Sequence, residues 1–339
     1  MNFDLSDEQR EIKSTAKEFL ADRFKAEKVR ELAEAGSYDD GLWKQICELG
    51  WPGIAIAESD GGQGLGTVEL AVLLEESGFA CAPSPLLGSA GAALVISAAG
   101  SEEQRGEWLP KLASGEATGA FGGADADSTL FCDLPTADVA VVFDGEGALL
   151  APASELDFEP VQTIDATRGY GTVSAPAGER LEGDVDAGRD RLAVAIAAEQ
   201  VGIGQRTLEM AVDYARERQQ FGRPIGAYQA VSHRCAEILL GVEEARSLTL
   251  YAAWAADAEP ESLPLAAAMA AARAADAAWE GAASALQVLG GIGFTWEHDL
   301  QFWLKRARVG GRMLGGPREH RDRVAELALG TAAPATTPA

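Results

Sequence analysis

The chain turns at the stretch Arg216-Glu217-Arg218-Gln219-Gln220-Phe221-Gly222-Arg223-Pro224-Ile225, which separates two long helical patterns. Apolar residues recur at helical spacing before it, over residues 192–216, and after it, over residues 225–256. Phe221 and Gly222 end the first helix and turn the chain, and Arg218 offers a planar fork of donors that suits a pyrophosphate. A surface arginine that only ends a helix would look the same. The stretch therefore predicts a local fold and leaves its chemistry open.

The sequence outside this turn divides into regions of different texture. Two more helical patterns, at 263–289 and 296–314, complete a predicted four-helix bundle at residues 186–330. Residues 1–115 are also helical in pattern, and residues 116–185 show short apolar runs broken by Gly, Asp and Pro, which is typical of a small β domain. The predicted strands lie at 139–143, 148–151, 158–161 and 171–173. We predict a mainly α fold with a small β domain (α+β) and a disordered tail at 331–339, where Thr, Ala and Pro dominate.

Composition excludes several classes of function. The 53 acidic residues outnumber the 28 basic ones and give a net charge of −25, which repels phosphate backbones and anionic lipid surfaces. No run approaches the ~20 uncharged residues of a membrane span. The first ten residues lack a signal-peptide pattern, so a cytoplasmic location is expected, with no nucleic acid and no membrane as partner. The scattered cysteines predict neither a metal site nor a disulfide framework; they are Cys47, Cys81, Cys132 and Cys235.

A second motif lies at the end of the third bundle helix and reads Gln287-Val288-Leu289-Gly290-Gly291-Ile292-Gly293-Phe294. Gly290 and Gly291 have no Cβ, so the backbone can approach a ligand closely there. A plain turn between helices is the alternative. A phosphate-binding loop of the P-loop class is a poor alternative, because no Lys-Ser or Lys-Thr follows the glycines.

Together with the N-terminal segments, these motifs resemble the acyl-CoA dehydrogenase family. The N-terminal part contributes Leu49-Gly50-Trp51-Pro52-Gly53-Ile54, Gly61-Gly62-Gln63-Gly64-Leu65-Gly66, Leu74-Glu75-Glu76-Ser77-Gly78 and Glu103-Gln104-Arg105. The bundle contributes an Arg-x-x-Phe-Gly segment and a Gln-x-Leu-Gly-Gly-x-Gly-Phe segment. Each motif is weak alone, but their shared order between residues 49 and 294 is a strong signal. The resemblance implies a three-domain architecture, FAD as cofactor and an acyl-CoA thioester as substrate.

The resemblance also implies roles for particular residues. Arg218 would reach the pyrophosphate of an FAD that is bound mainly by the neighbouring subunit, and the cofactor-binding set would include Phe221 and Gln229. Gln287, with the backbone of Gly290 and Gly291, would line the adenine end of the same FAD. Electrons would pass to an electron-transfer flavoprotein or a similar acceptor.

The sequence departs from the family pattern at the catalytic base. Most members carry a glutamate some 24 residues after the first glycine of the Gly-Gly pair, and the residue there is Leu314, which cannot accept a proton. A minority place the glutamate before an Arg-Leu pair at the start of the first bundle helix. Asp190, before Arg191 and Leu192, is the only candidate there and is one methylene shorter. The alternative role for Asp190 is to stabilise the N-terminal dipole of the helix that it opens. For Glu199, later in the helix, interior pairing is expected.

A second departure concerns the flavin ring. The family's Thr-Glu-Pro-x-Ala-Gly-Ser-Asp segment is replaced by residues 122–128, Gly-Gly-Ala-Asp-Ala-Asp-Ser, in a short β domain. The motifs that serve a neighbour's FAD are intact, whereas those that serve the chain's own flavin are not. This asymmetry predicts the short, base-lacking subunit of a heteromeric enzyme, as in actinobacterial members that act on steroid side chains. The alternatives are a self-sufficient homomer that uses Asp190 and a non-catalytic scaffold without FAD.

Overall fold

The computed structural model describes residues 4–123 and 130–330. The predicted disordered tail at 331–339 and most of the segment 122–128 lie outside the described residues. Within them the fold is mainly helical with a small sheet, as predicted. No described helix is long and apolar enough to cross a membrane.

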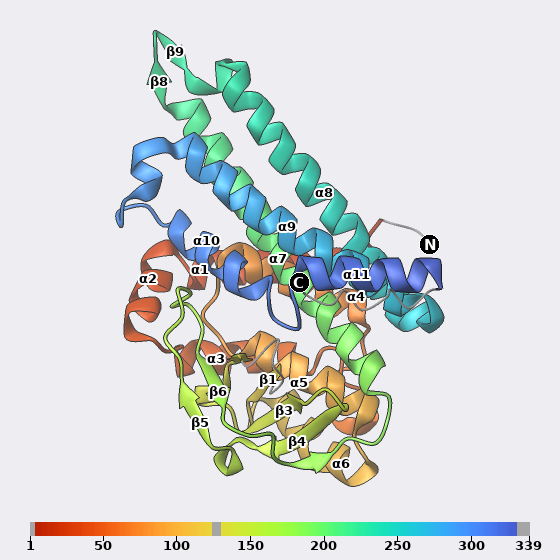
Figure 1. Ribbon diagram of the computed structural model, residues 1–339. Helices are drawn as coiled ribbons and strands as arrows, with labels where there is room; N and C mark the ends of the chain where they lie inside the picture. The colour runs from red at the N-terminus through yellow and green to blue at the C-terminus, as the bar shows by residue number, and fades with distance from the viewer. Residues whose placement is uncertain (1–3, 124–129, 331–339) are drawn as a thin grey trace, which may run out of the picture.

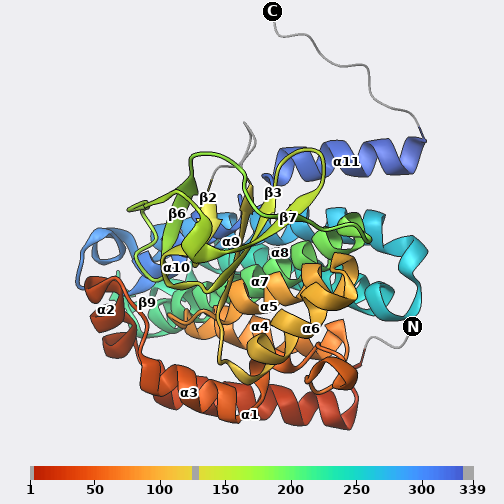
Figure 2. The same ribbon diagram turned by 90° about the horizontal axis from the view of Figure 1, so that it is seen from below.

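The N-terminal region consists of helices, as predicted. They are α1 (Asp7–Arg23), α2 (Ala26–Ala35), α3 (Asp40–Glu48), α4 (Thr67–Ala80), α5 (Leu86–Ala99) and α6 (Glu102–Ser114). Capping boxes begin α1 and α6: the hydroxyl of Ser6 accepts from the N–H of Gln9, and that of Ser101 from the N–H of Gln104. Helix α5 is almost entirely buried because it lies between the other helices and one face of the sheet (Figure 2).

A seven-stranded sheet follows, in the order β5-β6-β2-β1-β3-β4-β7. Strands β1 and β3 are parallel and the other neighbours antiparallel. The strands are β1 (Gly119–Gly123), β2 (Leu130–Cys132), β3 (Val139–Phe143), β4 (Ala148–Pro152), β5 (Phe158–Pro160), β6 (Tyr170–Val173) and β7 (Glu179–Arg180).

The four predicted strands are present as β3 to β6, but β1, β2 and β7 were not predicted. Strand β1 contains three glycines and so lacks an apolar alternation. Gly122 is needed there, because a Cβ on it would lie 2.5 Å from the ring of Phe131 on β2. Strands β2 and β7 are only three and two residues long, which is too short for a periodic signal.

The C-terminal region is built on three long helices, α7 (Val185–Glu217), α8 (Gln229–Ala258) and α9 (Leu263–Leu289). A small hairpin of β8 (Gln219–Gln220) and β9 (Arg223–Pro224) joins α7 to α8. Helix α10 (Leu300–Gly310) and helix α11 (Pro317–Leu329) complete the region. In Figure 1 the three long helices form an elongated bundle, with the hairpin at its far tip and the sheet near the opposite end.

The predicted bundle needs three corrections. The fourth predicted helix, 296–314, is shorter, because α10 ends at Gly310 and the glycines that follow break the helix. A further helix, α11, was not predicted: it contains only three large apolar residues, Val324, Leu327 and Leu329, and none of its residues is buried. In addition, α7 begins at Val185 rather than near residue 192, and Asp184 caps it by accepting from the N–H of Ala187 at 2.9 Å.

A buried charge cluster ties the sheet to the bundle. It consists of Asp133, Asp165, Arg168, Glu199 and Arg306. Arg168, in the loop before β6, donates to both oxygens of Glu199 on α7, at 2.6 and 3.2 Å. The interior pairing expected of Glu199 is thereby confirmed. Burial works against the Glu199 carboxylate, but the neighbouring guanidinium groups of Arg168 and Arg306 lower its pKa below the usual value.

The other members of the cluster are held by hydrogen bonds. Arg306 on α10 donates to the hydroxyl and the carbonyl of Thr167, at 2.9 and 2.7 Å, and to the carbonyl of Ala82 at 3.1 Å. Tyr170 donates its hydroxyl hydrogen to Asp165 at 2.8 Å. One polar network therefore fixes three parts of the chain: the loop before β6, α10 and the segment with Ala82 that joins α4 to α5.

Close packing of α4 on α7 gives a first prediction. A Cβ on Gly202 of α7 would lie 1.8 Å from the carbonyl oxygen of Glu75 on α4, so Gly202→Ala must force the helices apart. We expect the free energy of unfolding to fall by about 3 kcal/mol, as for overpacked cores. Gly106→Ala is the matched control, because Gly106 is exposed on α6 with no atom within 4 Å of the new Cβ, and should raise stability by up to about 1 kcal/mol. Equal denaturation midpoints for the two variants would contradict this packing.

A second prediction concerns pH. Burial raises the pKa of Asp133 to about 6, although the nearby Arg168 opposes the change. The folded protein therefore holds this proton more tightly than the unfolded chain, and the stabilisation is fully present below the ordinary aspartate pKa and lost as pH rises through about 6. In the wild type this group should lower the unfolding free energy by about 3 kcal/mol between roughly pH 4 and 6. Asp133→Asn should lack this fall, because its side chain does not titrate. Denaturant titrations at several pH values would measure the unfolding free energy of both proteins. If the two free energies change with pH in parallel, the raised pKa of Asp133 is wrong.

Candidate functional site

The hairpin at the tip of the bundle holds three of the predicted cofactor residues. Arg218 follows the last residue of α7, with its N–H donating to the carbonyl of Tyr214 at 2.8 Å. Phe221 and Gly222 form the two-residue turn, with φ of 53° and 81°, which are the positive values that a type I′ turn requires. Phe221 is 90% exposed and meets the ring of Tyr228 edge-on at 6.3 Å. Gln229 is exposed at the start of α8.

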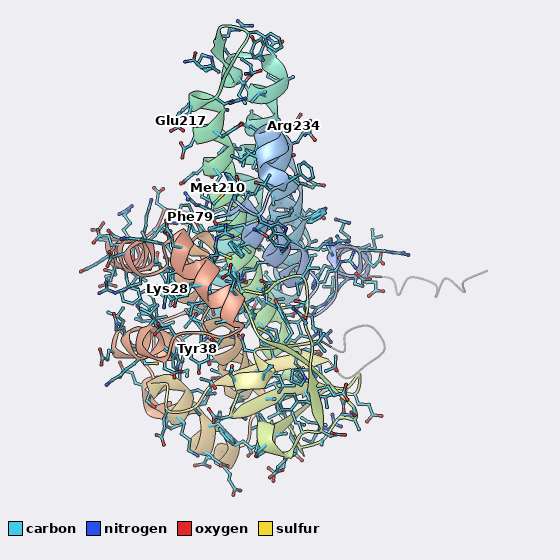
Figure 3. All side chains as sticks on the ribbon, turned by 90° about the vertical axis from the view of Figure 1, so that its left-hand side faces the viewer. Lys28, Tyr38, Phe79, Met210, Glu217 and Arg234 are labelled. Atoms are coloured by element: carbon cyan, nitrogen blue, oxygen red, sulfur yellow. The ribbon has the colours of Figure 1, made fainter. Side chains whose placement is uncertain are left out.

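Arg218 is free to bind an anion. Its side chain is exposed, and no described residue forms an ion pair with it. Figure 3 shows Glu217, the last residue of α7, high on the bundle and far above Lys28 and Tyr38 of the N-terminal region. The guanidinium group therefore lies well away from the chain's own sheet.

The glycine motif lies at the same end of the bundle, because α7, α8 and α9 alternate in direction (Figure 1). Gly290 ends α9 with φ 62° and ψ −138°, a conformation open mainly to glycine. A Cβ built on Gly290 or Gly291 would meet no atom within 4 Å, and Gln287 is exposed. The exposed backbone here can admit a ligand from outside the chain.

The geometry of these residues fits part of an FAD molecule. A free guanidinium suits the diphosphate, and an open glycine backbone suits close approach of a flat ring. The residues that the family uses for the flavin ring fall mostly in 124–128, outside the described residues. The outward-facing segments are therefore the part of the chain whose exposed groups match the chemistry of FAD.

Asp190 lies at the other end of α7. It is 28 positions before Arg218, which at about 1.5 Å per residue corresponds to roughly 40 Å. The expectation that Asp190 opens the helix was wrong, because α7 begins at Val185. Both carboxylate oxygens of Asp190 accept from Arg323 on α11, one of them at 2.9 Å, and the side chain is 1% exposed. Burial raises the pKa of Asp190, with Arg323 opposing that change.

Leu314 is packed into the core between α10 and α11. It is 8% exposed and has a φ of 60°, which is unusual for a residue other than glycine. Its side chain belongs to the main apolar cluster of the protein. The position at which the family's usual glutamate is expected therefore carries an apolar, buried group.

The sequence analysis missed two residues that contact the candidate site residues: Arg323, which pairs with Asp190, and Tyr228, which lies beside the hairpin turn. Arg323 was not foreseen because it lies 133 positions after Asp190, on a helix that was not predicted. Tyr228 directly precedes Gln229 and could have been noticed as an aromatic residue beside the turn.

A cavity of about 430 Å³ lies elsewhere, between the end of α2 and the loop before β6. Asp133, Arg168 and Tyr170 line it, and none of the predicted cofactor residues does. No group of three or more His, Cys, Asp or Glu side chains in the described residues is arranged to hold a metal ion.

Family profiles match both helical regions. The profile of the acyl-CoA dehydrogenase N-terminal domain matches residues 6–116, and that of the acyl-CoA dehydrogenase C-terminal domain matches residues 189–329. The first match spans α1 to α6, and the second spans most of α7 and all of α8 to α11.

Individual relatives agree over most of their length. Acyl-CoA dehydrogenase IpdE2 of Mycobacterium tuberculosis is 36% identical over 289 residues, covering 85% of this chain and 86% of the relative. IpdE2 of Mycolicibacterium smegmatis is 34% identical over 322 residues, covering 94% and 98%.

Among solved structures, a variant of the Tcur3481-Tcur3483 steroid ACAD has a TM-score of 0.86 at 26% identity, covering 96% of this chain and 99% of that one. The ChsE4-ChsE5 complex from Mycobacterium tuberculosis has a TM-score of 0.85 at 24% identity, covering 98% and 100%, and shows the fold alone. With two family profiles and relatives above 30% identity over most of the chain, the protein belongs to the acyl-CoA dehydrogenase family.

Proposed function

We propose that this chain is the base-lacking subunit of an FAD-dependent acyl-CoA dehydrogenase and works together with a second subunit that carries the base. The observation that carries the proposal is the contrast between the two ends of α7. At the hairpin end, Arg218 and the Gly290-Gly291 backbone are open to a ligand. At the other end, Leu314 is buried and Asp190 is bound to Arg323.

The hairpin end would hold the cofactor of the partner. Arg218 would donate to the diphosphate of FAD, and Gln287 with the exposed glycine backbone would contact its adenine end. The chemistry supplied by bound FAD is acceptance of a hydride from the β-carbon of an acyl-CoA thioester. Electrons would then pass to an electron-transfer flavoprotein or a similar acceptor.

The proton has to leave by another route. A general base must come within about 3 Å of the proton that it takes, directly or through one water. Leu314 has no basic atom, and the carboxylate of Asp190 already accepts two hydrogen bonds from Arg323. The α-proton of the thioester would therefore go to a carboxylate of the partner subunit.

Exposed apolar side chains on the bundle favour assembly. They gather on α8, on α9 and in the segment after α9: Leu239, Leu240, Trp279, Ile292, Phe294 and Trp296. Obligate interfaces of this kind bury about 2,000 Å² or more. One structural relative carries a paired name, Tcur3481-Tcur3483, which supports a heteromer here. A stable monomer in sedimentation, with or without the partner, would argue against it.

Arg218→Ala tests the cofactor assignment. Loss of a charge-assisted contact with the diphosphate should weaken FAD binding by about 1.5 to 3 kcal/mol. Flavin content after gel filtration and the dissociation constant from flavin fluorescence, both measured on the assembled complex, would report it. Flavin content and affinity equal to those of the wild type would refute this role of Arg218.

Turnover measurements test the division of labour. The chain alone should not dehydrogenate acyl-CoA thioesters at a useful rate, because it forfeits the ~10² to 10⁴-fold that a general base supplies. The complex with the partner should be active with an artificial electron acceptor. Asp190→Asn should leave that activity per folded complex unchanged.

Arg323→Gln is the matched control, because it breaks the same ion pair from the other side. If Asp190 is structural, both variants should lower thermal stability alike and neither should change turnover in the complex. Robust activity of the chain alone that disappears only in Asp190→Asn would instead make Asp190 the base of a homomeric enzyme. If the partner subunit alone binds FAD and is fully active, this chain would be a non-catalytic scaffold.

A further inference from the structure

The β8–β9 hairpin presents a second arginine beside Arg218. Gln220 pairs with Arg223 and Gln219 with Pro224 in the antiparallel ladder. The N–H of Ile225 donates to the carbonyl of Arg218 at 2.8 Å, which extends the same pairing by one step. Residues directly opposite in such a ladder point to the same face, and successive residues alternate. Arg218 and Arg223 are therefore diagonal neighbours on one face of the hairpin.

Tyr228 fixes the position of Arg223. The guanidinium carbon of Arg223 lies 4.2 Å from the centre of the Tyr228 ring, and the Tyr228 hydroxyl donates to the carbonyl of Gln220 at 3.2 Å. Stacking on an aromatic ring leaves the N–H groups at the edge of a guanidinium free to donate. No described residue forms an ion pair with Arg223, and its side chain is exposed. Arg223 is thus stacked on Tyr228, with donors that no described ion pair uses.

We infer that Arg218 and Arg223 together form a clamp for a diphosphate, with Tyr228 as the positioning residue. The inference rests on the proposed function, which supplies the diphosphate as part of a dinucleotide held by the partner subunit. Two guanidinium groups match the two negative charges of a diphosphate, and each can donate a pair of hydrogen bonds to phosphate oxygens. In a chain of net charge −25, such a local pair is needed to offset the general repulsion of an anion.

The hairpin shape supports this use. Its turn consists of Phe221 and Gly222, both with positive φ, so the two strands keep the twist that a short ladder needs. The tip projects beyond the rest of the bundle (Figure 1), so a bound diphosphate can approach it from another chain. Ordinary surface arginines on a flexible loop would lack both the shared face and the fixed stack.

The test compares arginine variants in the complex with the partner subunit. Arg223→Ala should weaken FAD binding by about tenfold or more, as measured by flavin fluorescence. Arg223→Lys should have an intermediate affinity, since it keeps the charge and loses the planar fork. Tyr228→Phe keeps the stack and should bind nearly as well as the wild type. Arg216→Ala is the matched control: Arg216 is exposed on α7 and lines a groove between α7 and α8, and its loss should leave affinity unchanged.

Competition with nucleotides separates a diphosphate clamp from a general charge effect. ADP should displace FAD from the wild-type complex more readily than AMP, and this preference should shrink in Arg223→Ala. If Arg223→Ala binds FAD like the wild type while Arg218→Ala loses it, the clamp is refuted and the proposed function stands. If neither variant loses FAD, the proposed function fails as well. An equal loss in Arg216→Ala would also overturn the clamp, because it would show only the effect of net charge.

Discussion

The carboxylate of Glu199, held between Arg168 and Arg306, is the contact on which the arrangement of sheet and bundle depends. Taking charges out of water is costly, and a buried ion pair offsets that cost only when its geometry is good and its remaining donors are used. Here Arg168 makes two hydrogen bonds to Glu199, and each terminal nitrogen and the Nε of Arg306 has a partner or a charge nearby. The imperfect part is Arg168 Nε, which lies 3.7 Å from Asp133, too far for a hydrogen bond. The cluster therefore fixes where loop, α7 and α10 meet, even if its net contribution to stability is small.

Helix α7 then acts as a rigid rod with two different ends. Its middle is locked by the charge cluster and by the close approach of Gly202 to α4. Near its start Asp190 is paired with Arg323 of α11, a helix that packs on α9. Its last turn runs free of the body and carries the hairpin. Because α7 is fixed in its middle, the hairpin at its end keeps a set position relative to the rest of the chain. Arg218 can therefore face a neighbouring subunit without contacting the sheet of its own chain.

The sequence predicted strongly periodic elements well and polar or very short ones poorly. Helix α9 matches the predicted range 263–289, because its small apolar residues are buried along its length. Helix α11 has no buried residue, and β1 is a glycine-rich strand, so neither carries the pattern that marks such elements. The motif residues of the hairpin are contiguous in sequence and could be found there. The Asp190–Arg323 pair could not, because only the tertiary fold brings α7 and α11 together.

The distance between Asp190 and Arg218 along α7 explains how proton removal and cofactor binding can be divided between two chains. Sites more than about 10 Å apart with no shared partners contribute to energy almost independently. Asp190 and Arg218 are roughly 40 Å apart at about 1.5 Å per residue of α7. Replacing a base by leucine therefore does not disturb the residues that would hold a neighbour's cofactor. A subunit can in this way lose the acid–base half of the reaction and keep its half of a shared cofactor site, provided that its partner supplies the carboxylate.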